Sequence, residues 1–231
     1  MKNKSVKVIR LATVAFTLDV LLKGQLKYLN KYFQVIAVAS KDNHLNNIRN
    51  REGVETKSLK MKRHISIFQD LISLFKLYIY FKKSKPQIIH SITPKAGFLS
   101  MIAGYFAKVP IRMHTFTGLI FPTKSGWMKK LLVLMDKLLC VCATHVYPEG
   151  KGVKQDLINH KITDKPLKIL VNGNINGIDS DFFNPKKFND KTFTIREELG
   201  ISPHDFVFVF VGRLVGDKGI NELVSSLFTS S

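Results

Sequence analysis

Short apolar runs alternate with segments of helical spacing along most of the chain, and this alternation restricts the fold more than any other feature. Compact runs rich in β-branched and aromatic residues are predicted as strands: Val6–Leu11, Gln34–Ala39, Gln87–His90, Ile111–Phe116, Val141–Tyr147, Leu167–Val171 and Phe206–Val211. Val54–Leu59 is a weaker strand candidate. Nearly continuous apolar strands favour parallel pairing, with helices on both faces of the sheet. The sequence therefore predicts an α/β fold built on a doubly wound parallel sheet.

Helical spacing fills the gaps between these strands. The predicted helices are Leu18–Tyr32, Ile65–Lys83, Lys95–Ala107, Gly126–Leu139 and Gly150–His160. Ile65–Lys83 carries a wide apolar stripe, which a helix packed on the sheet explains and for which contact with a membrane surface is the alternative. Charged residues interrupt every apolar run before it reaches the ~18 to 20 residues that a membrane span needs. With no secretory signal in the opening residues, we expect a soluble or peripheral protein in the cytoplasm.

The formal net charge of +19 belongs to the first two thirds of the chain. Residues 1–148 hold 25 Lys and Arg against 6 Asp and Glu, whereas residues 149–231 hold 11 of each class. Clustered basic residues attract phosphate, so an anionic membrane, a nucleic acid and a merely solvated basic face are the alternatives. No nucleic-acid-binding motif accompanies the charge, and we expect no nucleic-acid partner.

Cysteines and histidines argue against a metal centre. Cys140 and Cys142 are too close in sequence for a disulfide framework and too few for a zinc site, so we expect reduced, buried thiols, as in a cytosolic protein. The histidines form no close i,i+4 pairs, and no metal site is expected.

The strand–helix pattern breaks near Val171, where a stretch rich in Asn, Gly and Asp begins. We therefore divide the chain into a first domain at 1–171, a linker at 172–204 and the start of a second α/β domain at 205–231. That last segment holds one strand and one predicted helix, Gly219–Leu227. A single strand and helix cannot bury their own faces, so we expect the second domain to be truncated.

A glycine-rich loop follows the last predicted strand and precedes the last predicted helix. In this loop Gly212 permits close backbone approach, Arg213 offers a two-pronged guanidinium, and Lys218 places a charge near a helix start. These residues could hold a diphosphate, and an ordinary turn with solvated charges is the alternative. The spacing matches neither the Walker A loop nor the G-x-G-x-x-G fingerprint.

Taken in order, the motifs resemble those of the GT-B glycosyltransferases of family 4, and most closely the bacterial members that build capsular or O-antigen polysaccharide. The shared motifs are Leu21–Leu29, Thr93–Gly97, His114–Leu119, the turn Asn176–Asp179 with the following Phe182, Phe183 and Pro185, an R-x-x-L-G segment, and G-R-L…K-G after an apolar strand. The resemblance covers nearly the whole chain. It implies a complete Rossmann-like acceptor domain followed by the first βα unit of a Rossmann-like donor domain.

The resemblance also implies an activity and a site. A retaining hexosyltransferase would transfer sugar from a nucleotide sugar, by default a UDP-sugar, to a lipid-linked saccharide, without a metal or another cofactor. Gly212, Arg213 and Lys218 would bind the donor diphosphate, and His114 would be catalytic, near the reacting sugar. Candidates on the acceptor side or in loops near the donor are His90, Lys95, Gly24, Gln25, Thr117 and Gly118. For His90, a packed structural role is an equal alternative.

The chain departs from the family pattern in two places. The usual Gly-Gly loop after the first strand is missing, which leaves only Lys23, Gly24 and Gln25 as weak candidates there, and the chain ends before the family's E-x7-E glutamates. We therefore expect no sugar transfer by this chain alone. The basic first domain would suit a peripheral position on the inner face of the plasma membrane, where a lipid-linked acceptor lies. The alternative is a basic module that binds phosphate, nucleic acid or a membrane surface without transferase activity.

Overall fold

The computed structural model describes residues 6–187, 195–212, 214 and 216–228. The chain forms two compact units, Met1–Gly177 and Ile178–Ser231. The two units differ strongly in packing.

The first unit is built on six parallel strands in the order β3-β2-β1-β4-β5-β6. They are β1 (Lys7–Val14), β2 (Gln34–Ser40), β3 (Glu55–Ser58), β4 (Ile88–Ser91), β5 (Ile111–Phe116) and β6 (His145–Pro148). The chain moves outward from β1 to β3, then returns and moves outward in the other direction from β4. Because ligands of such sheets bind where the strand order reverses, a site is expected at the carboxyl ends of β1 and β4. The predicted doubly wound parallel sheet is confirmed.

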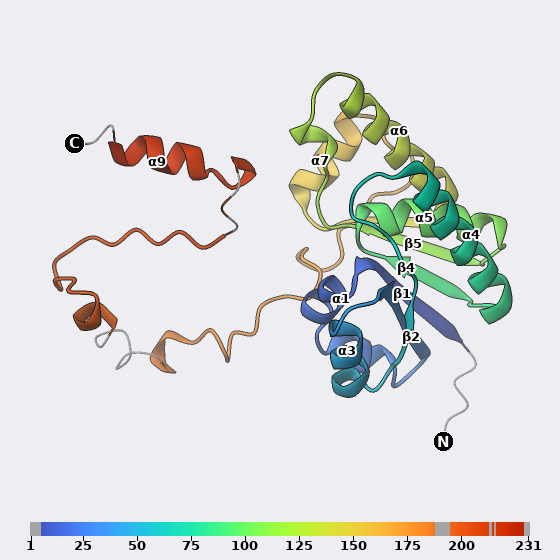
Figure 1. Ribbon diagram of the computed structural model, residues 1–231, viewed down its shortest axis with the longest axis horizontal. Helices are drawn as coiled ribbons and strands as arrows, with labels where there is room; N and C mark the ends of the chain where they lie inside the picture. The colour runs from blue at the N-terminus through green and yellow to red at the C-terminus, as the bar shows by residue number, and fades with distance from the viewer. Residues whose placement is uncertain (1–5, 188–194, 213, 215, 229–231) are drawn as a thin grey trace. The chain divides into compact units, whose positions relative to one another are not determined.

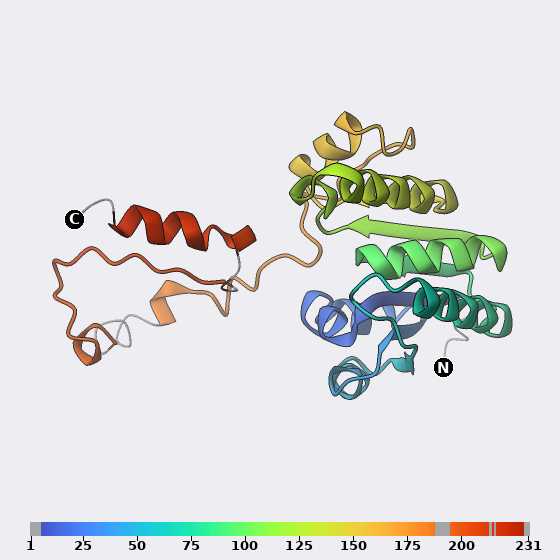
Figure 2. The same ribbon diagram turned by 45° about the horizontal axis from the view of Figure 1, so that its top comes forward.

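Helices cover both faces of this sheet (Figure 1). They are α1 (Ala15–Leu21), α2 (Gln25–Leu29), α3 (His44–Glu52), α4 (Ile67–Ser84), α5 (Pro94–Phe106), α6 (Gly126–Cys142) and α7 (Lys151–Asn159). Alternate residues of β2 separate two cores: Ile36 and Val38 pack in the cluster that includes residues of α4, α5 and α6, whereas Val35 and Ala37 pack with residues of α1 and α3. Figure 2 shows α5 running alongside β5, with which it is in contact. Among the described residues, none of the helices has the length and apolarity that crossing a membrane requires.

Two helices differ from the prediction. The helix expected over Leu18–Tyr32 is two short helices, because Gly24 adopts a φ of +77° between α1 and α2. Helix α3 was not predicted, although Leu45 and Ile48 lie three residues apart and are buried. Gly53, which ends α3 with a φ of +65°, was a further signal.

Two predicted strands at the end of the first unit are wrong or displaced. The strand expected over Val141–Tyr147 begins only at His145, because α6 continues to Cys142. Cys140 and Cys142 are buried free thiols, as expected, and lie on that helix. Lys165 satisfies the end of α6 by donating to the carbonyl oxygens of Cys140 and Ala143. Leu167–Val171 forms no strand, since the backbone turns at Val171, whose φ is +51°.

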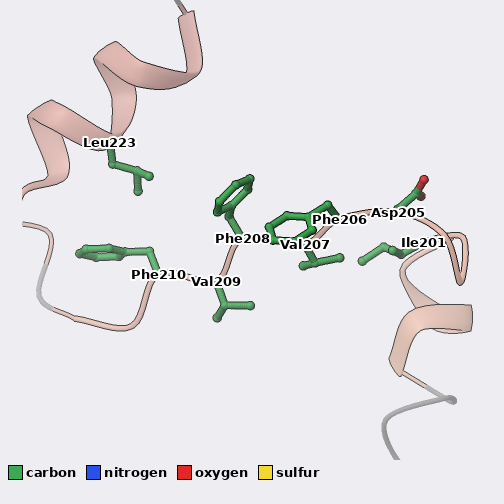
Figure 3. Close-up of a pocket in the computed structure, with 8 residues that line it drawn as sticks. All are labelled: Ile201, Asp205, Phe206, Val207, Phe208, Val209, Phe210 and Leu223. Carbon is green, nitrogen blue, oxygen red and sulfur yellow. The ribbon is translucent and has the colours of Figure 1, made fainter. Parts of the chain in front are cut away.

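In the second unit, the described residues include helix but no strand. The elements are the single turns η2 (Pro185–Lys187) and η3 (Gly216–Lys218), a short helix at 195–198, and the predicted last helix, α9 (Ile220–Phe228). The segment Phe206–Val211, predicted as a strand, is extended but unpaired among the described residues. Figure 3 shows its side chains pointing to alternate sides. Together with Leu223 of α9, they line an open hollow. Phe206 and Phe208 are 83% and 76% exposed. A strand needs the backbone of a neighbouring strand, and the described residues of this unit supply none. The expected first βα unit of a second domain is therefore present as a helix without its strand.

Candidate active site

The carboxyl ends of β1 and β4 are joined by two threonines. The backbone N–H of Thr13 donates to Thr93 Oγ1 at 2.9 Å, and the two hydroxyl oxygens lie 2.9 Å apart. The backbone N–H of Ala96, in the first turn of α5, reaches Thr13 Oγ1 at 3.3 Å. These bonds fix the start of α5 at the point where the strand order reverses.

A buried arginine connects three segments on the α1 side of the sheet. Arg10 of β1 donates to His90 Nδ1 and, at 3.1 Å, to Gln25 Oε1. Gln25 in turn donates to the carbonyl oxygen of Ile175 at 3.1 Å. Because Nδ1 of His90 accepts from Arg10, its proton is on Nε2, which lies 2.8 Å from Thr115 Oγ1 and donates to it. The network therefore joins β1, β4 and β5 to Gln25, the first residue of α2.

The charge of this network is not balanced. Burial lowers the pKa of Arg10 to about 10, so the guanidinium remains protonated at neutral pH. Burial and the adjacent Arg10 hold the pKa of His90 well below its usual range, so His90 is neutral. Among the described residues, Arg10 forms no ion pair, and its Nε has no hydrogen-bond partner. Since burying an uncompensated charge costs stability, this arrangement marks a site that packing alone does not explain.

His114 lies on the other face of the sheet and is 1% exposed. Its Nδ1 is 2.8 Å from Ser91 Oγ, and its ring packs edge-on against Phe116 with 4.5 Å between centroids. A Cβ atom added to Gly97 of α5 would lie 2.4 Å from the His114 ring, so the ring occupies the space that the glycine leaves. Burial lowers the pKa of His114 to about 3. The two candidate histidines are therefore both neutral and are on opposite faces of the sheet.

The candidates Gly24, in the loop before α2, and Gln25, the first residue of α2, belong to a segment that is held from two sides. The Glu52 carboxylate accepts from the backbone N–H groups of Gly24 and Lys27, each at 3.0 Å. The side chain of Asn176 donates to the carbonyl oxygen of Lys23 at 2.9 Å. This loop therefore lies against residues 175–176, where the first unit ends.

Lys95, Thr117 and Gly118 follow β4 and β5. Lys95 forms an ion pair of 2.7 Å with Asp70 and donates to the carbonyl oxygen of His64, which joins α5 to the segment before α4. Thr117 Oγ1 donates to the carbonyl oxygen of Ile92 at 2.9 Å, and Gly118 has a φ of +140°. Lys95 and Gly118 line one cavity of about 580 Å³, whereas Thr117 does not.

The candidate diphosphate residues belong to the second unit. Gly212 and Lys218 are exposed, and Lys218 ends η3 just before α9. Arg213 lies outside the described residues. Among the residues that the structure describes, no three His, Cys, Asp or Glu side chains come together as a metal site would need. The donor role of this loop stays a prediction.

Sequence reasoning missed two residues that the structure makes prominent. Arg10 stands alone as a charge inside the apolar run Val6–Leu11, and that was the available signal. Asp136 interrupts the apolar residues of α6, lines the same cavity as Lys95, and has its pKa raised to about 7 by burial.

Comparison with known proteins places these features in a family. A family model described as glycosyl transferase 4-like matches residues 10–146, more than half of the chain. The chain belongs to this family. The resemblance expected from the motifs is thus confirmed, and the match spans Arg10, His90 and His114.

Individual relatives extend the comparison. Over 98% of its length, this glycosyl transferase 4-like chain is 33% identical to the capsular polysaccharide biosynthesis glycosyltransferase CapM of Staphylococcus aureus. Over 68% of its length it is 34% identical to the UDP-Gal:alpha-D-GlcNAc-diphosphoundecaprenol alpha-1,3-galactosyltransferase of Escherichia coli. The chain spans 57% of the first relative and 39% of the second.

Solved structures show the same fold. The structure of HepE from Anabaena in complex with UDP and glucose aligns with a TM-score of 0.69, covering 96% of this chain and 57% of that one at 15% identity. At that identity the similarity concerns the fold: this chain and HepE share the doubly wound sheet.

Proposed function

We propose that the chain is the acceptor-side part of a retaining glycosyltransferase that transfers a sugar from a UDP-sugar to a lipid-linked saccharide in surface polysaccharide biosynthesis. The observation that carries the proposal is the 33% identity with the S. aureus capsular glycosyltransferase over 98% of this chain. The name of the E. coli relative supports a UDP-sugar donor and a diphosphoundecaprenol-linked acceptor. The UDP bound to HepE, which has the same fold, supports the same donor class.

The proposed chemistry needs positive charge at the donor diphosphate. Arg213 and Lys218, beside Gly212, would stabilise the nucleoside diphosphate as it departs with negative charge, and these two cations would take the place of a metal ion. His114 is the candidate catalytic residue. Because its ring is fully buried in this structure, contact with a sugar requires α5 or the loop after β5 to move. Gly24, in the loop before α2, and Gln25, the first residue of α2, are proposed to approach the donor.

A fusion tests the activity. The full chain is joined to the part of the S. aureus relative that follows the aligned region and is incubated with radiolabelled UDP-sugars and N-acetylglucosaminyl diphosphoundecaprenol. We expect labelled lipid from the fusion, with retained anomeric configuration by NMR. Arg213→Ala and Lys218→Ala should each lower kcat about 100-fold, the size found for a lost transition-state donor. Lys186→Ala, an exposed lysine of the same unit, is the matched control. A folded fusion that transfers no sugar from any UDP-sugar contradicts the proposal.

The unfused chain should transfer no sugar. The segment Phe206–Val211 has no strand partner among the described residues and exposes its phenyl rings, so a donor loop attached to it lacks support. The same radiolabel assay, run on the chain alone, checks this expectation. Turnover comparable to that of the fusion contradicts it.

A peripheral position on the inner face of the plasma membrane completes the proposal. The outer face of α4 exposes Ile67, Phe68 and Phe75, and Phe68 is 83% exposed. The net charge of +19 adds attraction to anionic lipid. Flotation with phosphatidylglycerol vesicles should capture the chain at low salt and release part of it at 0.5 M salt, with neutral vesicles as the control. Binding to nucleic acid in preference to these vesicles would instead favour the basic module without transferase activity.

A further inference from the structure

One cavity in the first unit combines an apolar lining with charges at the edge of the sheet where the candidate residues lie. Its volume is about 580 Å³, within the range of small-molecule sites. It is bounded by the segment 63–65, the first turn of α5, the loop after β5 and one side of α6. It therefore lies at the carboxyl ends of β4 and β5.

The lining is mostly apolar and comes from three elements. Its side chains include Phe98 of α5, Phe116 and Leu119 at the end of β5, and Met128, Leu132 and Met135 of α6. The α6 positions are spaced by four and three residues, so they form one continuous strip on the helix. Thioether and branched side chains of this kind adapt to a flexible aliphatic chain.

The charged residues of the lining are not equivalent. Lys95 is neutralised by its ion pair with Asp70. Arg63 and Lys124 are exposed, and among the described residues neither has an ion pair or a side-chain hydrogen bond. Two free cations beside an apolar cavity suit an anion that carries an apolar chain.

The one carboxyl group of the lining is Asp136, and within the described part of the chain it forms no ion pair. Because burial raises its pKa to about 7, a large fraction of the molecules carry it uncharged near neutral pH. It then repels a nearby phosphate little and can donate a hydrogen bond to an ester or hydroxyl oxygen.

Other ligand classes fit this lining less well. A nucleotide or a free sugar needs many polar partners, and this cavity offers few. A bilayer surface contacts exposed faces such as that of α4 and does not enter a cavity. A polyprenyl phosphate has both the aliphatic chain and the anion.

We propose that this cavity binds the phosphate end of a polyprenyl-phosphate-linked acceptor, with the first isoprenoid units on Phe98, Leu132 and Met135 and the phosphates at Arg63 and Lys124. The inference rests on the proposed function for the choice of acceptor. It adds the place where the lipid is held. With the phosphates at this edge of the sheet, the attached sugar would extend along the carboxyl ends of β4 and β1.

Direct binding tests the site without any sugar transfer. The full chain is titrated with farnesyl diphosphate, inorganic diphosphate and farnesol, and binding is followed by calorimetry and by the fluorescence of Trp127, the single tryptophan, which precedes Met128 on α6. We expect farnesyl diphosphate to bind at least about tenfold more tightly than either half-ligand, since it uses both parts of the site. Binding no tighter than that of inorganic diphosphate overturns the proposal.

Variants separate the two parts of the site. Arg63→Ala/Lys124→Ala should weaken farnesyl diphosphate about tenfold or more and leave farnesol unchanged. Lys41→Ala/Lys57→Ala removes the same charge outside the lining and should change neither. Leu132→Trp, which fills the cavity, should weaken the binding of farnesyl diphosphate and of farnesol together. Its binding is measured by calorimetry, because the variant adds a second tryptophan, and circular dichroism verifies that it folds. Equal weakening by the two double variants overturns the proposal.

Two comparisons of results distinguish the cavity assignment from the proposed function and from binding to the membrane surface. If the fusion transfers sugar but the chain does not bind farnesyl diphosphate, the cavity assignment is wrong and the proposed function stands. If farnesyl diphosphate binds but the fusion is inactive, the function is wrong and the cavity stands. Loss of vesicle flotation by Arg63→Ala/Lys124→Ala, in parallel with loss of farnesyl diphosphate binding, would assign these cations to the bilayer surface and overturn the proposal.

Discussion

His90 and His114 lie on neighbouring strands, yet the two faces of the sheet give them different surroundings. On the α1 side, His90 belongs to a polar network in which a buried Arg10 has no counter-ion among the described residues and bonds Gln25 at the start of α2. On the α5 side, His114 is enclosed by Phe116, Gly97 and Ser91. On one face, hydrogen bonds therefore connect the histidine to residues outside the sheet, whereas on the other face packing holds the histidine in place. The following changes test that difference, first those that destabilise the native state, from the largest expected loss to the smallest, and then one that stabilises it.

Adding one carbon on the packed face should cost the most stability. Gly97→Ala places a Cβ atom 2.4 Å from the His114 ring, which is buried and also packs against Phe116. We expect the free energy of unfolding to fall by about 3 kcal/mol, at the upper end of overpacking. Urea unfolding at pH 7.5 measures it. The matched control is Gly152→Ala in α7, where the new Cβ meets nothing within 4 Å, and it should be neutral or stabilising by up to about 1 kcal/mol. Equal effects of the two changes would mean that the ring is not packed against α5.

Acid should unfold the protein through both histidines. Burial lowers the pKa of His114 from 6.5 to about 3, so between these values the unfolded chain binds a proton that the native state does not. The contribution of neutral His114 to the free energy of unfolding is therefore fully present above pH 6.5. It falls as the pH decreases, by about 2 kcal/mol between pH 6.5 and pH 5. His114→Gln should flatten that slope by about half and leave the share due to His90. Unfolding curves at several pH values check this, and an unchanged slope contradicts it.

Removing one partner on each face compares the two kinds of hydrogen bond. Gln25→Ala leaves the buried Arg10 guanidinium with one bond fewer, and we expect a loss of about 2 kcal/mol. Ser91→Ala leaves the neutral His114 Nδ1 unpaired at about 1 kcal/mol. Only Gln25→Ala should also speed hydrogen exchange at residues 174–176, since Gln25 donates to Ile175. If both variants speed that exchange alike, the polar network does not connect the loop to this segment.

One change on the packed side should stabilise the native state. Burial raises the pKa of Asp136 from 3.8 to about 7, so ionising it destabilises the native state as the pH rises from 3.8 to 7, and the penalty is constant above that. Asp136→Asn should therefore raise the free energy of unfolding by up to about 4 kcal/mol at pH 8 and by less than about 1 kcal/mol at pH 4. Chemical denaturation at the two pH values is the measurement. A gain of the same size at pH 4 would indicate a packing effect.

The fold was predictable where a segment's local pattern agreed with its neighbours. Val6–Leu11 and Phe206–Val211 have similar apolar character, but the first pairs with β2 and β4, whereas the second has no pairing strand among the described residues. Composition along a segment does not reveal whether a partner is present. The break between α1 and α2 likewise depends on one backbone angle at Gly24, which sequence periodicity does not reveal.

The position of several candidate residues in the fold was predictable, but their contacts were not. His90, Gln25 and Lys95 were singled out because they follow strands or belong to motifs, and they do lie near the carboxyl edge of the sheet. Which face each side chain occupies depends on register, since His90 pairs with Met113 and Ser91 with His114. Arg10 was missed because a single charged residue in an apolar strand looks like a break in the pattern. Its role becomes visible only when its partners on other elements are known.

The turn that ends the first unit has a mechanical consequence. The backbone N–H of Asn174 is bonded to Glu149, Ile175 to Gln25 and Asn176 to Lys23, so these three residues are tethered one after another. Gly177, with a φ of +72°, is the first residue after the tethers. A force on the chain from beyond Gly177 would therefore act first on the hydrogen bonds to Lys23 and Gln25. Through Gln25 it would reach Arg10 before it acts on the bond to Glu149, which follows β6.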